Sequence, residues 1–368
     1  MQELLILGTR GVPASHGGFE TFAELLALHL RQRGWSVAVY CQRDGAETAL
    51  TEDEWQGIRR IIVPAPGAGP ISTMRFDWRC LKDVRNRPGR LLVLGYNTAI
   101  FDALLLGRRR GDVFINMDGI EWKRRKWSLP AKIWFWFNER IAALSGATLI
   151  ADHPEIALRL ARIAPRARTV MIPYGAHRIT AASPEPLVAL GLRSDDYFIS
   201  ICRIEPENSI LEIVKAFAAR PRRRRLVVLG RLDPAGSAYH REVAEAANDL
   251  VLFPGAIYEQ GRIASLRFHA RAYCHGHQVG GTNPSLVEAL GAGSAVMAQD
   301  NAFNRWVAGP EQFYFADVAA CAALFDRLDG EGEPEALRRA RAAAVARFEE
   351  GLTWPAVLQQ YETLLETN

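Results

Sequence analysis

The feature that most limits how this chain can fold is a nearly continuous alternation of short apolar runs and amphipathic helical segments. The runs predict strands near residues 3–8, 36–41, 58–63, 91–94, 112–116, 147–151 and 169–172, and then near 197–202, 225–229, 250–253, 272–274 and 294–297. Helices are clearest over 20–33 and 284–292. The end of the chain, 335–367, is expected to be helical with a break near Gly351 and Pro355. This alternation predicts doubly wound α/β structure, in which crossover helices cover parallel sheets.

The length of the chain indicates two domains. At 368 residues it exceeds what one hydrophobic core usually organises, and two domains of about 150 to 200 residues fit it. The segment His177–Arg193 is rich in Ala, Pro and Ser and lacks a strong periodicity, so we expect the linker there. This divides the chain into an N-terminal domain, 1–178, and a C-terminal domain, 179–351. The last segment, about 352–368, is expected to pack back on the N-terminal domain.

Charge and cysteine usage narrow the class of protein. Lys and Arg number 45 against 41 acidic residues, and the net charge of +4 is too small over the whole chain to argue for a nucleic-acid partner. Five cysteines without a short Cys-x-x-Cys spacing favour a reducing cytoplasm. The chain starts in a strand pattern rather than a signal peptide, and no apolar run approaches the roughly 18 residues that span a bilayer. We therefore expect a cytoplasmic protein that can touch a membrane without crossing it.

A glycine-rich loop follows the first expected strand. The stretch Gly8–Glu20 places Gly17 and Gly18 immediately before a helix. Amides left accessible by glycines, together with the positive end of the helix dipole, can bind a phosphate. The spacing is neither a dinucleotide fingerprint nor a P-loop, and a flexible strand-to-helix turn is the alternative. Glu20 is expected simply to sit favourably in the first helical turn.

A basic and aromatic segment lies in the N-terminal half. Residues 122–136 hold four Trp and five basic residues, among them Trp122, Lys123, Arg124 and Trp127. Trp favours the interface between water and lipid, and each basic residue near an anionic membrane contributes about 1 kcal/mol. The segment is therefore a candidate membrane-facing surface. The alternative is that its aromatic residues belong to a helix core and its charges to a solvated face.

Four segments together resemble a known family. They are Gly8–Glu20, Asn116–Arg124, Cys202–Asn208 and His275–Ala289, and they extend over nearly the whole chain. The chain resembles retaining glycosyltransferases of the GT-B fold, in particular a bacterial rhamnosyltransferase-like subgroup of polysaccharide biosynthesis. The resemblance implies an α/β fold with two Rossmann-like, doubly wound domains facing each other across a cleft. It also implies a metal-independent reaction of a nucleoside-diphosphate sugar, without a cofactor.

The resemblance implies diphosphate-binding residues in the C-terminal domain. In the family an Arg after the first strand of that domain holds the diphosphate, and Arg203 matches it. Its planar guanidinium suits phosphate oxygens. The accompanying Lys of the family falls at Asn208, which carries no charge, and this leaves the second diphosphate contact open. Glu207, in the same segment, is placed with the donor-binding residues.

The family also carries a pair of glutamates near the start of a helix in this domain. Glu288 matches the second, which binds the ribose hydroxyls, whereas the first falls at Gly280. Nearby candidates to hold the donor sugar instead are His277, Thr282 and Asn283. Pro284 suits the first position of the helix over 284–292. The free amides and the dipole of this helix are expected to point at a phosphate.

In the N-terminal domain the resemblance points to an acceptor site after the strand expected at 112–116. Many relatives have a His there, and this chain has Asp118. A carboxylate at a strand end could orient the acceptor hydroxyl or accept its proton, so Asp118 is the candidate catalytic residue. The alternative is a turn residue, because Asp-Gly is a common turn signal. The set expected to face the acceptor or the membrane is Glu121, Trp122, Lys123, Arg124 and Trp127.

The expected function is transfer of a hexose, with retention, from a dTDP- or UDP-linked donor to a hydroxyl of a lipid-linked or polysaccharide acceptor. L-Rhamnose from dTDP-rhamnose is the specific hypothesis, and the cytoplasmic face of the inner membrane is the expected place. One alternative is a sugar-nucleotide epimerase or hydrolase of the same fold. Another is a nucleotide- or glycan-binding protein without activity, which the changes at Asn208 and Gly280 suggest. No metal is expected, because His269, His275 and His277 lack zinc-site spacing.

Overall fold

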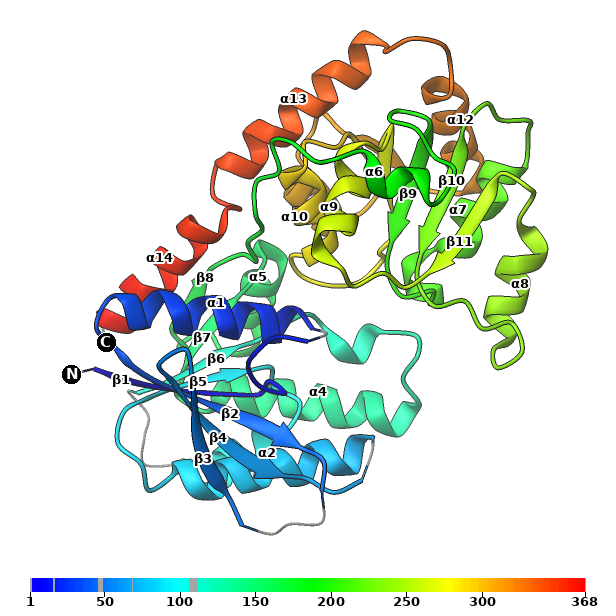
Figure 1. Ribbon diagram of the computed structural model, residues 1–368. Helices are drawn as coiled ribbons and strands as arrows, with labels where there is room; N and C mark the ends of the chain where they lie inside the picture. Colours follow the sequence, from blue (N-terminus) through cyan, green and yellow to red (C-terminus); the bar gives the residue numbers. More distant parts are fainter. Residues whose placement is uncertain (1, 16, 46–48, 68, 106–111, 368) are drawn as a thin grey trace. The chain divides into compact units, whose positions relative to one another are not determined.

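The chain divides into two compact units in the computed structural model, which describes residues 2–15, 17–45, 49–67, 69–105 and 112–367 (Figure 1). Unit 1 comprises Met1–Lys123, Trp127–Pro173 and Val357–Asn368, and unit 2 comprises Arg124–Lys126 and Tyr174–Ala356. The chain passes from unit 1 to unit 2 between Pro173 and Tyr174, whereas the sequence predicted the domain boundary at residue 178. The first residues of the expected linker, from His177, are part of unit 2.

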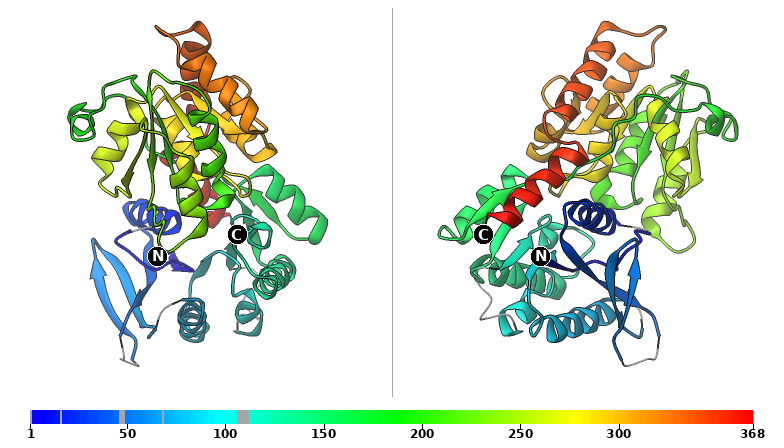
Figure 2. Two further views of the ribbon diagram at one scale, coloured as in Figure 1. Left: turned by 90° about the vertical axis from the view of Figure 1, so that its right-hand side faces the viewer. Right: turned by 60° about the vertical axis from the view of Figure 1, so that its left-hand side comes forward.

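Unit 1 is built on an eight-stranded sheet, counted over the described residues. Its elements are β1 (Glu3–Leu7), α1 (Gly18–Gln32), β2 (Ser36–Arg43), β3 (Thr51–Trp55), β4 (Ile58–Pro64), α2 (Pro70–Val84), β5 (Arg90–Leu94), α3 (Ala99–Leu105), β6 (Val113–Asn116), the 3₁₀ turn η1 (Glu121–Lys123), α4 (Leu129–Leu144), β7 (Thr148–Ala151), α5 (Pro154–Ile163) and β8 (Thr169–Met171). The strand order is β3-β4-β2-β1-β5-β6-β7-β8, with β3 antiparallel to β4 and the other pairs parallel. Helix α1 lies on one face of the sheet and α2 and α4 on the other (Figures 1 and 2).

The hydrophobic pattern of the sequence predicted the central strands of unit 1 but did not predict its edge strand β3. Leu4, Leu5 and Ile6 of β1 are completely buried, because helices cover both faces of a parallel sheet. Strand β3 was not predicted, because its residues are polar and mostly exposed. It is an edge strand, held by backbone pairing with β4 and by an ion pair of 2.7 Å between Arg60 and Asp53.

Unit 2 holds a six-stranded sheet, again counted over the described residues. Its elements are α6 (Glu185–Val188), β9 (Tyr197–Ile201), the 3₁₀ turn η2 (Pro206–Asn208), α7 (Ile210–Ala218), β10 (Arg225–Leu229), α8 (Ala238–Ala246), β11 (Val251–Gly255), α9 (Gln260–Phe268), β12 (Ala272–His275), α10 (Pro284–Gly291), β13 (Val296–Gln299), α11 (Ala302–Ala308), β14 (Phe313–Phe315), α12 (Val318–Leu328) and α13 (Glu335–Glu349). The order is β11-β10-β9-β12-β13-β14, and these pairs are parallel. Strand β14 was not predicted, because three residues are too few to establish a period.

Aromatic packing organises the core of unit 2. Phe198 of β9, Phe217 of α7 and Phe325 of α12 are completely buried. Their rings meet edge to face in pairs, with centroids 5.0 to 6.4 Å apart. Such contacts add to the stabilisation from buried area. The three rings therefore fix two helices against the central strand.

The chain ends in helix α14 (Trp354–Glu366), which follows α13 after a short turn. Gly351 lies in that turn with φ of 152°. The break expected near Gly351 and Pro355 is present, because α13 ends at Glu349 and α14 begins at Trp354; Pro355 lies in the first turn of α14, where a missing N–H group costs little. Within unit 1, Tyr361 of this helix packs on Phe22 of α1 with ring centroids 4.6 Å apart.

The five cysteines are free thiols, and four of them are buried. They pack as small apolar side chains.

Over the part of the chain that the structure describes, no helix has both the length and the apolar character that crossing a bilayer requires.

Candidate active site

Each sheet has one place where the chain reverses the direction in which it adds strands. In unit 1 this switch point lies between β1 and β5, and in unit 2 it lies between β9 and β12. Loops leave such a pair of strands in opposite directions, so a crevice forms outside their carboxyl ends, and ligands of doubly wound folds bind there. Arg203 follows β9 and His277 follows β12. Two sequence-predicted donor residues therefore lie on the two loops of one switch point.

Asn208 joins these two loops. Its Nδ2 donates to the Arg203 carbonyl oxygen at 2.7 Å, and its Oδ1 lies 2.6 Å from Nδ1 of His277. Because the amide oxygen accepts, Nδ1 of His277 carries the proton and Nε2 is left as a hydrogen-bond acceptor. Asn208 is buried, and it connects the loops instead of presenting a group to a diphosphate.

His277 is neutral at physiological pH. Its burial and the positive charge of Arg124, which belongs to unit 2 by its contacts, lower its pKa to about 4. The carbonyl oxygen of His277 accepts hydrogen bonds from Nδ2 of Asn301 and of Asn304 at 3.0 and 2.9 Å. A Cβ atom at Gly280 would approach His277 Nε2 to 3.0 Å. The imidazole also forms a hydrogen bond with the Val279 backbone, and glycine at position 280 keeps a Cβ atom away from Nε2.

The neighbouring residues of the first loop differ in exposure. The Arg203 side chain is 63% exposed and lies 3.4 Å from Glu205, so its guanidinium is available to an anion. Glu207, which the sequence predicts to contact the donor, is buried, and one of its carboxylate oxygens lies 3.6 Å from Arg124. Burial raises the pKa of Glu207, against the charges of Arg124 and Lys126. The Glu207 side chain therefore lies inside the loop, next to Arg124.

The start of α10 differs from the expectation in one respect. The Asn283 side chain accepts from the Ser285 amide at 3.0 Å, and the Asn283 carbonyl oxygen accepts from Leu286 and Val287 at 3.1 and 3.2 Å. Pro284 has no N–H group. The expectation of free first-turn amides is therefore wrong, because the cap uses them. What remains is the helix dipole and the loop that precedes the cap, in which Thr282 is buried.

Glu288 lies on α10 and forms an ion pair with Arg267 of α9. Arg267 is nearly buried, whereas the Glu288 side chain is 37% exposed. A carboxylate has four lone-pair sites, so one buried cation leaves sites for other donors. The pair holds Glu288 in one orientation with part of its carboxylate accessible.

In unit 1 the glycine loop is closed by carboxylates. The Ala14 amide donates to Glu24 at 2.6 Å and the Ser15 amide to Glu20 at 3.2 Å, so these two amides are not offered to a phosphate. Glu20 thus closes the loop, in addition to lying in the first turn of α1. His16 lies outside the described residues.

The glycines at the start of α1 remain candidates for a close approach of a ligand. Gly17 is extended, with φ of −137°, and a Cβ there would lie 3.5 Å from Glu20. Neither its conformation nor its packing requires glycine. Gly18 begins α1. The two glycines add no side chain at this end of the helix, where the Glu20 carboxylate lies beside Gly17.

Asp118 follows β6 in a turn. Its φ is 49°, in the left-handed region that Asp tolerates, and its N–H donates to Asn116 Oδ1 at 2.9 Å. Asn116 in turn donates from Nδ2 to the Tyr361 hydroxyl at 2.9 Å. No described residue bonds to the Asp118 carboxylate. The turn interpretation is therefore right for the backbone, and the side chain stays available.

The predicted membrane-facing residues largely turn inward. Glu121 is buried and accepts from Trp127 Nε1 at 3.2 Å. Trp122 donates from Nε1 to Glu139 at 3.1 Å. Lys123 is exposed beside the Trp122 ring, with Nζ 5.8 Å from its centroid. The two indoles therefore satisfy buried carboxylates instead of facing a lipid.

The exposed apolar surface of this region is on α4. Its members are Leu129, Ile133, Trp136, Phe137 and Leu144. Their spacing of three, four or seven residues places them on one side of the helix. The guanidinium of Arg140 stacks on the Trp136 ring, 3.5 Å from its centroid. The basic and aromatic composition of residues 122–136 pointed to this region, and the exposed apolar side chains are other residues than those named by the prediction.

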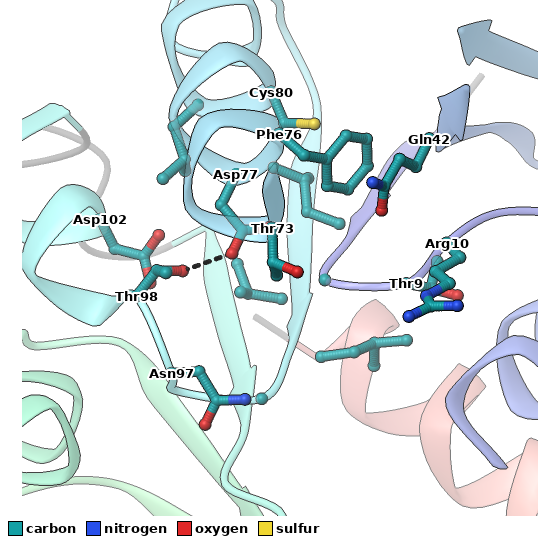
Figure 3. Close-up of a pocket in the computed structure, with 16 residues that line it drawn as sticks. Thr9, Arg10, Gln42, Thr73, Phe76, Asp77, Cys80, Asn97, Thr98 and Asp102 are labelled. Carbon is teal, nitrogen blue, oxygen red and sulfur yellow. Dashed lines mark hydrogen bonds between the residues drawn. The ribbon is translucent and has the colours of Figure 1, made fainter. Parts of the chain in front are cut away.

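A cavity of about 240 Å³ lies at the switch point of unit 1 (Figure 3). Gly8, in its wall, has φ of 81°, and a Cβ there would lie 2.2 Å from the Leu94 carbonyl oxygen, so only glycine lets this loop approach β5. Asp77 of α2 and Asp102 of α3 also line the cavity. Sequence reasoning missed both carboxyls, because they are far apart in the chain and belong to no motif.

Comparisons with known proteins agree with this architecture. A sequence-family profile described as a domain of unknown function (DUF1972) matches residues 1–177. No curated protein sequence matches the chain. Among solved structures, the sucrose-phosphate synthase of Thermosynechococcus elongatus is similar with a TM-score of 0.80 at 18% identity, covering 100% of this chain and 98% of that one.

Two further structures give the same result. The UDP-forming α,α-trehalose-phosphate synthase of Burkholderia xenovorans, in complex with glucose-6-phosphate, has a TM-score of 0.74 at 11% identity and covers 100% of both chains. An E. coli structure described as trehalose-6-phosphate, bound with UDP-2-fluoro glucose, has a TM-score of 0.75 at 10% identity and covers 100% of this chain and 99% of that one. The likenesses extend over both units, and the protein has the GT-B fold.

Proposed function

We propose that the protein is a glycosyltransferase that uses a nucleoside-diphosphate sugar as donor. The observation that carries this proposal is the switch point of unit 2, where an exposed Arg203 and a neutral His277 imidazole are held together through Asn208. A cation for a diphosphate and an uncharged acceptor for a sugar hydroxyl are the two chemistries that such a donor requires. The GT-B fold, with a similar structure bound to UDP-2-fluoro glucose, supports the same class of substrate.

The donor is proposed to contact unit 2 through three side chains. Arg203 binds the diphosphate and stabilises negative charge on the leaving group. Glu288, oriented by Arg267, accepts hydrogen bonds from the ribose hydroxyls. His277 Nε2 accepts from a hydroxyl of the donor sugar, at the place where Gly280 has no carboxylate. Thr282, Asn283, Gly17 and Gly18 remain proposed neighbours of the donor.

Asp118 is proposed to act on the acceptor. Its carboxylate accepts no hydrogen bond from the described residues, and Asn116 and the left-handed turn fix its position. Such a group can orient an acceptor hydroxyl and take its proton as the new glycosidic bond forms. The anomeric configuration is proposed to be retained and no metal to be needed, as in the family that the sequence resembles.

We propose L-rhamnose carried by dTDP as the donor, with UDP as the alternative nucleotide. This choice rests on the sequence resemblance to the rhamnosyltransferase-like subgroup. The nucleotide base is the first feature of the proposal that binding experiments can decide.

The acceptor is proposed to be lipid-linked or a growing polysaccharide at the cytoplasmic face of a membrane. Support comes from the exposed apolar row on α4, whose Trp136 and Phe137 suit the lipid interface. Lys132 and Arg140 on the same helix can meet anionic head groups, each contributing about 1 kcal/mol. A protein that contacts the membrane only through this row of side chains is a peripheral membrane protein.

A second candidate function is a nucleotide- or glycan-binding protein without transfer activity. The observation that favours it is Asn208, which is committed to linking two loops and supplies no charge to a diphosphate. Binding without turnover distinguishes this candidate from the transferase.

The test is thermal unfolding of the full chain with dTDP, UDP, GDP and their sugar conjugates. A ligand at 100 times its dissociation constant stabilises a folded protein by about 2.7 kcal/mol. Glu288→Ala should abolish the shift, whereas Glu242→Ala, an exposed glutamate on α8 of the same unit, should keep it. Transfer is then assayed by mass spectrometry with membrane lipid extracts. No shift with any nucleotide contradicts the proposal, and a shift without sugar transfer to any acceptor supports the binding protein.

A further inference from the structure

Two carboxyl groups meet in the wall of the unit 1 cavity. Asp77 of α2 and Asp102 of α3 both line it, and their carboxyl groups turn toward each other (Figure 3). The Thr98 hydroxyl donates to Asp77 Oδ2 at 2.9 Å. Asp102 is only 6% exposed, and no described residue donates a hydrogen bond to it. A buried carboxyl without a partner is costly, so its presence beside a cavity points to a ligand.

The raised pKa values of Asp77 and Asp102 also support a ligand in this cavity. Burial raises the pKa of Asp77 to about 6, against the hydrogen bond from Thr98. Burial and then the charge of Asp77 raise the pKa of Asp102 to about 7. The other titratable groups in the wall are Cys80, whose pKa is raised by burial, and Arg10. Near neutral pH the pair can therefore share one proton and still offer acceptor oxygens to a ligand.

The rest of the wall combines apolar and neutral polar groups. Phe76, Leu81 and Val93 supply apolar surface, and the side chains of Gln42 and Asn97 supply amides (Figure 3). A sugar ring has the matching surface, with C–H groups on its faces and hydroxyls at its edge. The volume of about 240 Å³ lies below the roughly 300 to 1,000 Å³ of pockets for drug-sized ligands, so it suits one sugar residue.

We propose that this cavity binds one uncharged sugar residue of the acceptor, with Asp77 and Asp102 accepting hydrogen bonds from two of its hydroxyls. The inference rests on the proposed glycosyltransferase function and specifies its acceptor. The pair keeps a negative charge near neutral pH even when it shares one proton, and this charge repels a phosphate beside it, with one guanidinium at Arg10 to offset it. The residue bound here is therefore a neutral sugar and not a sugar phosphate.

The experiment measures binding of simple sugars to the full chain by saturation-transfer NMR, with titration to a dissociation constant. The neutral probes are methyl α-L-rhamnoside, methyl α-D-glucoside and methyl α-D-mannoside. D-Glucosamine and glucose 6-phosphate are the cationic and anionic comparisons. The variants are Asp102→Asn, which removes the charge, and Thr73→Trp, which fills the mouth from α2. Arg75→Trp, exposed on the same helix and outside the cavity wall, is the matched control.

At least one neutral glycoside should bind saturably to the wild type and to Arg75→Trp. Its dissociation constant should rise about tenfold or more in Asp102→Asn, because the amide offers one acceptor oxygen where the carboxyl group of the pair offers two. Thr73→Trp should bind none of the probes. The inference is overturned if no neutral glycoside binds, if both cavity variants bind normally, if only glucosamine binds, or if glucose 6-phosphate binds as tightly as the best neutral probe.

Thermal shifts with dTDP and UDP on the same variants separate this inference from the proposed function. If a nucleotide binds every variant and no glycoside binds, the donor site stands and the cavity assignment fails alone. If glycosides bind as expected and no nucleotide does, the cavity is a sugar site and the glycosyltransferase proposal fails.

Discussion

The side chains of His277 and Asn208 meet at the switch point of unit 2, with Nδ1 2.6 Å from Oδ1. Their loops follow two different strands, β12 and β9, and are also packed closely: a Cβ at Gly276 would lie 2.1 Å from the Asn208 carbonyl oxygen. This hydrogen bond therefore connects the two loops and favours the tautomer with the proton on Nδ1. The proposed donor chemistry of His277 depends on that tautomer, because only the unprotonated Nε2 can accept from a sugar hydroxyl.

Replacing His277 by Ala should weaken binding of a nucleotide sugar about tenfold and leave binding of the free nucleoside diphosphate unchanged. The reason is that Nε2 is proposed to contact only the sugar, and a single hydrogen bond is worth about 0.5 to 1.5 kcal/mol. Calorimetric titration with dTDP-rhamnose and with dTDP checks the difference. Equal losses for both ligands would show that the imidazole supports the loop instead of the sugar.

Asp118→Asn should reduce the rate of sugar transfer about 100-fold or more, which is typical for loss of a positioned acid–base group. Asn also tolerates φ of 49°, so the melting temperature and the donor affinity should stay as in the wild type. Asp112→Asn, an exposed aspartate before β6, is the matched control. Full activity in Asp118→Asn would restrict this residue to its turn.

The double variant Ile133→Glu/Phe137→Glu should lower the affinity for vesicles that contain anionic lipid at least about tenfold, because burial of each side chain contributes about 1.5 to 3 kcal/mol. Both residues are exposed, so stability should change little. Leu158→Glu, which removes an exposed leucine from α5, is the control. Vesicle cosedimentation gives the measurement, and equal binding by all three proteins would remove α4 from the proposed membrane contact.

The stability of unit 1 should depend on pH through Asp77 and Asp102. Their pKa values in the folded chain, about 6 and about 7, exceed the ordinary value of 3.8. The folded state therefore binds more protons than the unfolded state between about pH 4 and pH 7. The contribution of the pair to the free energy of unfolding is complete below about pH 4 and is lost as the pH rises through 7.

Asp102→Asn cannot ionise and should be more stable than the wild type at pH 8 by about 1 to 3 kcal/mol, with a smaller difference at pH 4. Urea unfolding of both proteins at the two pH values measures this. Subtracting one protein from the other cancels groups common to both, such as His277, whose lowered pKa has the opposite effect. A difference independent of pH would contradict the assignment of the shifted pKa to Asp102.

Features that depend on neighbouring residues in the chain were predictable from the sequence, and features that depend on distant residues were not. The central strands β1 and β9 were predictable, because burial on both faces requires unbroken apolar residues. The polar edge strand β3 was not, because it is held by pairing with β4. Asn283 and Pro284 marked the start of α10 correctly, since capping involves neighbours in the chain.

By itself the sequence determined the two series of strands and helices, the loops that follow β1, β9 and β12, and the presence of Arg203, His277 and Asp118 on loops at strand ends. These features depend on periodicity and on residues close in the chain. Only the tertiary structure decided that Asn208 links two loops. It also decided that Glu20 and Glu24 occupy the amides of the glycine loop, and that Asp77 and Asp102 share one cavity. Those relationships arise between residues that packing brings together, and no local pattern records them.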